Sequence, residues 1–191
     1  MKNSMKVLIG IVVIVLLIIM SGVGGYNSLI NRSEEVDASL SEISVQLQRR
    51  NDLIPNLVET VQRYAQHEEQ IFTDIAEARS RLMGANTVAE QAEGDAAMTG
   101  ALSRLLAISE NYPDLKANEN FINLQDELAG TENRIATARR TYNNSAKKYN
   151  ASIRRFPTNI FATSLGFESV VYFEAEEGAS DNPNIGDLFG E

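Results

Sequence analysis

The chain has 191 residues, a formal net charge of −9 and no cysteine. Without cysteine it can form neither a disulfide framework nor a thiolate metal site. Its overall acidity argues against nucleic acid as a partner. Beyond an apolar N-terminal stretch, about 165 residues remain, enough for one domain with a hydrophobic core.

The apolar stretch covers residues 7–25. No charged residue occurs between Lys6 and Arg32, and the side chains from residue 7 to 20 are hydrocarbon apart from Gly10. As a helix, residues 7–25 would be about 28 Å long, close to the ~30 Å hydrocarbon core of a bilayer. Such a helix satisfies its backbone hydrogen bonds within lipid. We therefore predict a transmembrane helix that includes Val7, Ile11, Ile14, Leu17, Met20 and Val23.

The flanks of this stretch predict its orientation. Lys2 and Lys6 precede it, whereas Arg32 follows together with Glu34 and Glu35. Because cations are retained on the cytoplasmic side, the N-terminus is predicted inside and the body outside the cytoplasm. A cleaved signal peptide is the alternative, since the apolar core is short enough and Gly22-Val-Gly24 is a small-x-small site.

We predict an all-α fold, in which an antiparallel bundle of four long helices follows the transmembrane helix. The first helix starts near Asn27, because apolar residues recur at spacings of four, three and four. It can continue directly from the span, with Gly24-Gly25 as a swivel. Its apolar stripe consists of Val36, Leu40, Ile43 and Leu47.

Capping residues predict where the next two helices begin. Asn51-Asp52 reads as a cap, and Pro55 in a first turn loses no intrahelical bond, so a second helix is predicted from Asp52 to about Met83. Thr87 to Glu90 reads as a capping box that opens a third helix. Tyr112-Pro113 ends that helix, because a residue before proline avoids the α region.

The fourth helix, from about Ala117 to Phe156, has an unbroken heptad pattern. Large apolar residues in one column face small residues in the next, which suits close packing of nearly antiparallel helices. The large column is Phe121, Leu128, Ile135, Tyr142, Tyr149 and Phe156, and its companion is Leu124, Thr131, Ala138, Ser145 and Ser152.

Charge and hydropathy change after this helix. Residues 133–167 carry seven Lys or Arg and no acid, whereas residues 168–191 carry seven acids and no base. We predict four regions: a cytoplasmic stub with the anchor (1–25), the bundle (26–156), an apolar segment near the membrane (157–177) and a flexible acidic tail (178–191).

Two exposed-looking regions are predicted to contact a partner or the membrane. The first region is the turn of residues 49–55, which combines cations with apolar residues. The second is a basic row at one heptad position of the fourth helix, which would attract anionic lipid. Apolar residues beyond this row would then dip into the membrane interface. The alternatives are a capped turn, a solvated basic face with the apolar residues closing the bundle, or pairing of the row with the acidic tail or a neighbouring subunit. The residues are Arg49, Arg50, Pro55, Arg140, Lys147, Arg154, Ile160, Phe161, Leu165 and Phe167.

No catalytic, cofactor or metal site is predicted. The lone histidine, His67, lacks a second histidine four positions on, where Ile71 stands. The acidic residues from Glu168 onward could hold calcium only weakly, and a solvated acidic run is the simpler interpretation. No glycine-rich phosphate loop or Gly-x-Ser-x-Gly motif occurs. We therefore predict that the chain is not an enzyme.

Several blocks of the sequence, in order from residue 26 to 177, resemble the LemA family. The resemblance implies a bacterial protein with a single N-terminal span and a helical body, but it implies no catalytic site. The blocks are Tyr26-Asn-Ser-Leu29, Val45-Gln-Leu-Gln-Arg-Arg-Asn-Asp-Leu-Ile-Pro-Asn-Leu-Val-Glu-Thr-Val61, Tyr64-Ala65, Leu102-Ser-Arg-Leu-Leu-Ala107, Tyr112-Pro-Asp-Leu-Lys-Ala-Asn-Glu-Asn-Phe121, Glu132-Asn-Arg-Ile135, Tyr149-Asn150, Phe156-Pro157, Gly166-Phe167 and Tyr172-Phe-Glu-Ala-Glu-Glu177.

Pattern and resemblance together favour a membrane-anchored helical scaffold or adaptor in the cytoplasmic membrane of a bacterium. Its expected partners are the lipid bilayer, further copies of itself and other membrane or envelope proteins. Two other classes stay open: an envelope enzyme with an unrecognised site, and a signalling module in which helix shifts pass through the span.

Overall fold

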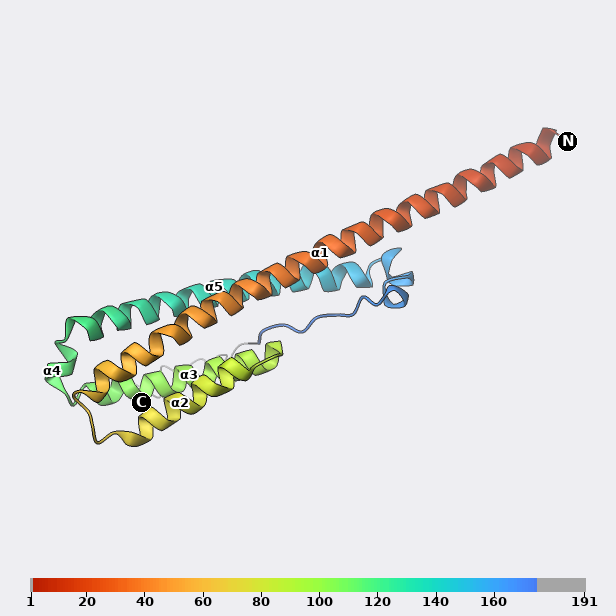
Figure 1. The fold of residues 1–191 in the computed structure, drawn as a ribbon. Helices are drawn as coiled ribbons and strands as arrows, with labels where there is room; N and C mark the ends of the chain where they lie inside the picture. The colour runs from red at the N-terminus through yellow and green to blue at the C-terminus, as the bar shows by residue number, and fades with distance from the viewer. Residues whose placement is uncertain (1, 175–191) are drawn as a thin grey trace, which may run out of the picture. The chain divides into compact units, whose positions relative to one another are not determined.

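The computed structural model describes residues 2–174, and their side chains except those at positions 2–4, 7, 15 and 18. The described residues form helices and no β-strand, as the all-α prediction requires. Figure 1 shows the order of the elements. The long helices are α1 (Lys2–Gln62), α2 (Glu69–Gly84), α3 (Val88–Ser109) and α5 (Glu119–Arg154), and the short ones are α4 (Pro113–Lys116), η1 (Thr158–Ile160) and η2 (Thr163–Leu165).

The chain divides into two compact units. The first takes in Met1–Pro55 and Asn123–Tyr172, and the second centres on Asn56–Ile122. The predicted acidic tail, residues 178–191, lies outside the described residues, as do residues 175–177.

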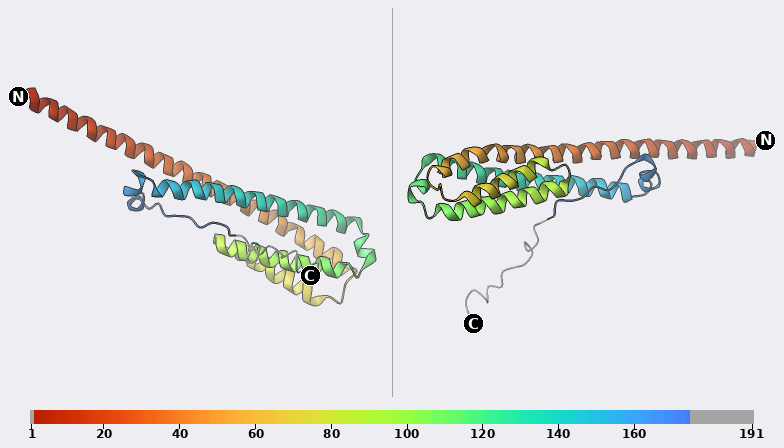
Figure 2. Two further views of the ribbon diagram at one scale, coloured as in Figure 1. Left: turned by 180° about the vertical axis from the view of Figure 1, so that it is seen from behind. Right: turned by 60° about the horizontal axis from the view of Figure 1, so that its bottom comes forward.

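In the first unit α1 and α5 run antiparallel (Figure 2). Arg49 pairs with Glu127 at one end of the two helices (3.7 Å), whereas Phe161, beyond the end of α5, contacts Gly25 at the other. In both predicted stripes most of the large residues are buried here. These are Val36, Ile43 and Leu47 on α1 and Leu128, Ile135, Tyr142 and Tyr149 on α5.

Helix α1 does not end at Asn51-Asp52, so the prediction of a new helix there is wrong. Asp52 accepts a hydrogen bond from the side chain of Gln48, one turn earlier, instead of capping a helix (2.7 Å). Apolar burial continues in phase from Leu47 through Ile54. Continuous packing thus outweighs the cost of about 3 kcal/mol for the interior proline, Pro55.

The break comes at residues 63–68, where the buried pattern loses its phase. Ala65 is buried one turn after Val61, but the next buried residue, Ile71, follows six positions later. Six residues rotate a helix by about 600°, so Ala65 and Ile71 could not share one face of a continuous helix. The chain turns instead, and a separate helix, α2, begins at Glu69.

In the second unit α2 and α3 form a close helical hairpin. The predicted capping box is confirmed: Thr87 accepts from the Glu90 N–H (3.1 Å), and the Glu90 carboxylate accepts from the N–H groups of Asn86 and Thr87 (2.7 and 3.0 Å). Gly94 allows the helices to approach, because a Cβ there would lie 2.8 Å from Cα of Leu82.

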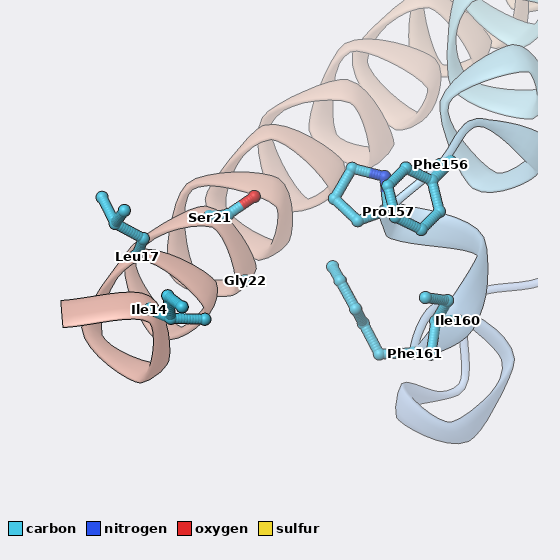
Figure 3. Close-up of a pocket in the computed structure, with 8 residues that line it drawn as sticks. All are labelled: Ile14, Leu17, Ser21, Gly22, Phe156, Pro157, Ile160 and Phe161. Atoms are coloured by element: carbon cyan, nitrogen blue, oxygen red, sulfur yellow. The ribbon is translucent and has the colours of Figure 1, made fainter. Parts of the chain in front are cut away.

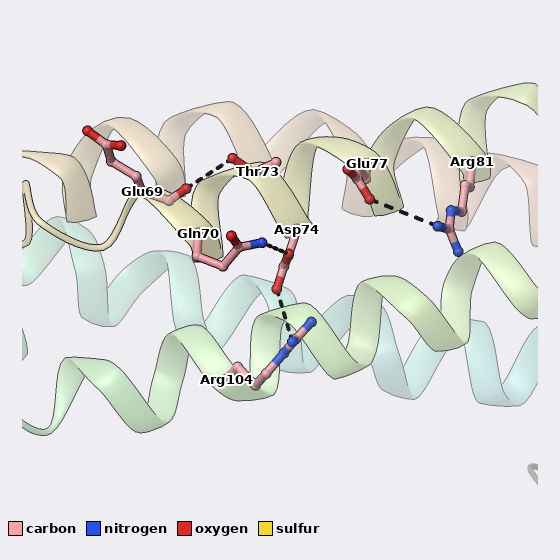
Figure 4. Close-up of polar contacts among 7 residues, drawn as sticks. All are labelled: Glu69, Gln70, Thr73, Asp74, Glu77, Arg81 and Arg104. Carbon is pink, nitrogen blue, oxygen red and sulfur yellow. Dashed lines mark hydrogen bonds and ion pairs between the residues drawn. The ribbon is translucent and has the colours of Figure 1, made fainter.

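Polar contacts join segments that are distant in sequence within this unit. On α2, Asp74 accepts from Gln70 (2.8 Å) and forms an ion pair with Arg104 of α3 (2.9 Å), as Figure 4 shows. Tyr112 donates to Glu68 (3.2 Å), and Asn118 donates to the Tyr64 hydroxyl (3.1 Å). Blocks that carry the family resemblance, around Tyr64 and from residue 112 to 121, therefore meet in space.

Candidate membrane-contact site

The N-terminal part of α1 carries an apolar surface that no other described segment covers along most of its length. Of the described residues, this is the one helix long and apolar enough to cross a membrane, with a mean hydropathy of 2.8 and none of that window buried. Ile11, Leu17 and Met20 are 53%, 61% and 71% exposed. The side chain of Val7 lies outside the described residues. An apolar surface of this kind is stable where its solvent is lipid or another apolar partner.

A short segment after α5, residues 156–167, folds against the end of this apolar surface, and we call it the collar. Its backbone is largely satisfied by its own turns: the amide of Ile160 bonds to Pro157, that of Phe161 to Thr158 and that of Leu165 to Phe161. Gly166 adopts a φ of 82°, a left-handed conformation that glycine tolerates without strain, and it reverses the chain.

Two aromatic rings attach the collar to α1. The ring of Phe161 lies so close to Gly25 that a Cβ there would be 3.0 Å from its Cζ. The ring of Phe167 packs edge-on against Tyr26, with the centroids 5.8 Å apart. Gly25 therefore serves close packing within an unbroken helix, and a swivel at Gly24-Gly25 stays a prediction.

The collar leaves an apolar groove of about 520 Å³ between itself and α1. Figure 3 shows Ile14 and Leu17 of α1 on one side of the groove, and Phe156 and Ile160 of the collar on the other. Phe156 is 80% exposed, although the heptad pattern predicts it in the core, because α5 ends at Arg154.

A polar pocket follows on α1 just beyond the apolar stretch. It is lined by Asn27, Ser28, Arg32 and Glu35 of α1 and by Lys148 of α5, among other residues. Two cations and one carboxylate thus border this pocket. Along α1, the pocket begins where the apolar groove ends.

An extended segment, residues 168–173, is fastened along α5 by side chains. Asn150 donates to the carbonyl of Val170 and accepts from its N–H, both at 2.9 Å, and Tyr142 donates to the carbonyl of Val171 at 2.8 Å. The backbone of residues 168–173 is neither helix nor strand. Burial raises the pKa of Tyr142, so its phenol stays protonated and remains a donor.

The collar residues predicted to meet lipid fall into two classes. Ile160 and Leu165 are exposed, at 68% and 52%, and their contact with the membrane remains a prediction. Phe161 packs on Gly25 and also lines the groove. Phe167 is buried against Tyr26, so its prediction as a membrane contact is wrong; packing within the unit takes its ring.

The basic row lies exposed on α5. Arg140, Lys147 and Arg154 are exposed, and among the described residues no carboxylate lies within ion-pairing distance of them. Of the turn residues, Pro55 and Arg49 are exposed.

Arg50 differs from its neighbour. It is buried and forms an ion pair with Glu132 at 2.7 Å, so predicting it as a surface contact is wrong. A buried cation requires such a carboxylate partner, because leaving it unpaired would cost several kcal/mol.

Sequence reasoning did not identify the polar pocket, nor the roles of Gly25 and Asn150. Tyr149-Asn150 is one of the blocks of the family resemblance, but periodicity does not report which backbone a side chain will meet. His67 is exposed, and no group of three metal-ligating side chains occurs within the described part of the chain.

Comparison with known proteins identifies one matching family and several similar proteins. The sequence profile of the LemA family matches residues 39–186. The chain is 31% identical to magnetosome protein MamQ 2 of Paramagnetospirillum magneticum and 30% identical to MamQ of Magnetospirillum gryphiswaldense, each over 84% of this chain and 68% of the relative. It is 28% identical to protein LemA of Metamycoplasma hominis, over 81% of this chain and 71% of the relative.

Proposed function

The chain belongs to the LemA family, and on that premise we propose that it is a single-span membrane protein whose helical body organises partners at the membrane surface. The observation that carries the proposal is the exposed apolar part of α1, which continues without a break into the folded body. Relatives named as magnetosome proteins support association of this chain with a membrane.

The proposed topology places the N-terminus in the cytoplasm and the body outside, in the cytoplasmic membrane of a bacterium. Lys2 and Lys6 precede the apolar stretch, whereas Arg32 is followed by Glu34 and Glu35. The retention of cations on the cytoplasmic side supports this direction.

A scaffold role is supported by the kind of surface that the body presents. The exposed row of Arg140, Lys147 and Arg154 is available for anionic lipid heads or an acidic protein surface. Further copies of the chain and other membrane or envelope proteins are the proposed partners. Self-association can be measured as the mass of the detergent-solubilised chain by light scattering, and a monomer at micromolar concentration would exclude a stable homo-oligomer.

A signalling role is the second candidate, because α1 connects the apolar stretch to the body as one continuous helix. A continuous helix transmits rotation or translation, whereas a flexible linker would not. Replacing residues 7–23 by an unrelated apolar sequence of the same length separates the two roles. Function that survives the replacement indicates a passive anchor, and function that is lost with normal membrane insertion indicates signalling.

The topology is tested by labelling a single cysteine, since the native chain has none. Ser180→Cys is placed in the C-terminal region, and intact cells are treated with a membrane-impermeant maleimide, with lysed cells as the control. Labelling of intact cells is the expected result and places the body outside the cytoplasm. Labelling only after lysis reverses the topology, and full release of the protein by alkaline carbonate would overturn the membrane anchor itself.

A further inference from the structure

One face of α1 changes from apolar to polar at the position along the helix where the apolar stretch ends. Its members recur at spacings of four, three, four, three and four, so they lie along one side of the helix. The early members line the apolar groove and the later ones line the polar pocket. In order they are Leu17, Ser21, Gly24, Ser28, Asn31 and Glu35.

The groove lies at the depth of lipid if α1 spans the membrane. Ile14 and Leu17 precede Gly25 by eleven and eight residues, which places them about 16 and 12 Å deeper along the helix axis. If the collar excluded lipid from this level, only residues 7–13 would remain for crossing, about 10 Å of helix against a ~30 Å core. The collar must therefore enter the bilayer beside α1.

The collar has the properties that entry requires. Backbone groups within hydrocarbon need internal hydrogen bonds, and the turns of the collar supply them for the N–H groups of residues 159–162 and 165–167. Phe156, Ile160 and Leu165 give it exposed apolar side chains, alongside the exposed polar residues Asn159, Thr163 and Ser164. Arg154 and Arg155 directly precede the collar, and both are exposed.

We propose that this face of α1 holds one phospholipid, with an acyl chain in the groove and the phosphate in the polar pocket against Arg32 and Lys148. Groove and pocket differ in chemistry as the two parts of a phospholipid do, and they follow each other along the helix in the matching order. The inference rests on the proposed membrane span.

The charge of the pocket selects the class of lipid. Arg32 and Lys148 contribute two positive charges and Glu35 one negative charge, so a lipid with a net negative head is preferred over a zwitterionic one. One basic residue near the membrane surface strengthens binding of anionic lipid about fivefold. In a bilayer with one anionic lipid in ten, the site would then hold anionic lipid about one third of the time.

The test uses tryptophan fluorescence, because the native chain contains no tryptophan. Phe156→Trp places a fluorophore at the groove with little change in shape. Ile19→Trp is the matched control: it is exposed on α1, two residues and about 200° away from Leu17. Each full-length variant is placed in phosphatidylcholine vesicles in which one lipid in ten is a brominated phosphatidylglycerol or a brominated phosphatidylcholine, since bromine quenches tryptophan on contact.

The expected result is stronger quenching of the Phe156→Trp variant by brominated phosphatidylglycerol than by brominated phosphatidylcholine, about threefold in the quenched fraction, with no such difference for Ile19→Trp. Adding Arg32→Gln and Lys148→Gln should abolish the difference. Adding Arg140→Gln, an exposed cation outside the pocket, should leave it unchanged.

Other outcomes overturn the inference in distinguishable ways. Equal quenching of both variants by both lipids would mean that the chain spans the membrane without a lipid site. Selectivity that survives loss of Arg32 and Lys148 would place the anionic head elsewhere. Quenching of Ile19→Trp without quenching of Phe156→Trp would show that the collar stays outside the lipid, which overturns the site but not the span. Absence of quenching in both variants would refute the span, and with it the proposed function.

Discussion

Asn150 offers the sharpest test of how the C-terminal segment is held in the first unit. Its buried side chain makes two 2.9 Å hydrogen bonds to the backbone of Val170. In Asn150→Ala the carbonyl and N–H of Val170 both lose their protein partner. With about 1 kcal/mol net for each bond, we expect a loss of about 2 kcal/mol.

The matched control is Asn144→Ala, an exposed position on the same helix. Both substitutions gain the same helix propensity, so the difference between them isolates the two bonds. Asn150→Asp retains an acceptor for the Val170 N–H but places a buried carboxylate against the Val170 carbonyl, so a loss at least as large as that of Asn150→Ala is expected.

Hydrogen exchange at the Val170 amide measures the effect directly, since that N–H donates to Asn150. A loss of 2 kcal/mol predicts exchange about 30-fold faster in Asn150→Ala than in Asn144→Ala. In thermal unfolding followed by circular dichroism, the same loss lowers Tm by about 4–8 °C. Equal exchange rates and equal Tm values in the two variants would refute the argument that Asn150 fastens the segment.

Three further predictions concern packing and capping. Gly25→Val should displace Phe161 and destabilise the first unit by about 1–3 kcal/mol in chemical unfolding, whereas Gly24→Val, where nothing lies within 4 Å of the added Cβ, should not. Gly94→Ala should destabilise the α2–α3 hairpin by a similar amount, because the added methyl group would contact Leu82. Gly100→Ala, in open space on the same helix, should instead stabilise the hairpin by about 1 kcal/mol. A stabilised Gly94→Ala variant would contradict the close approach of the two helices. Hydrogen bonds from the N–H groups of Asn86 and Thr87 lower the pKa of Glu90, so its contribution to stability is present above the unfolded-state pKa and lost as pH falls through the folded-state pKa. Glu90→Gln should therefore be less stable than the native chain at neutral pH and equally stable in acid, as measured by unfolding at several pH values; a difference independent of pH would show that the charge of Glu90 does not act.

The sequence predicts features that depend on neighbours along one helix. The apolar stretch of α1, the heptad column of α5 as far as Tyr149 and the capping box at Thr87 all follow from local spacing, and the described structure contains each of them. The prediction fails at Pro55, where local chemistry indicates a helix start but tertiary packing keeps the helix continuous. The break at residues 63–68 had no signal in the sequence, because Tyr64 and Ile71 are seven residues apart and in phase; the structure buries Ala65 rather than Tyr64, and only there does the phase slip.

The amino-acid sequence by itself determined that the chain is all-α and that one helix is apolar enough to enter a membrane. Both properties follow from hydropathy and periodicity, which act between residues close in sequence. Only the tertiary structure decided that the collar lies against Gly25, that Asn150 holds Val170, and that Arg32 and Lys148 border one pocket. These pairs are separated by 20 to more than 100 residues. The contacts with Gly25 and Arg32 depend on the antiparallel register of α1 and α5, and that of Asn150 depends on how the chain returns along α5 after Gly166; no local pattern specifies either.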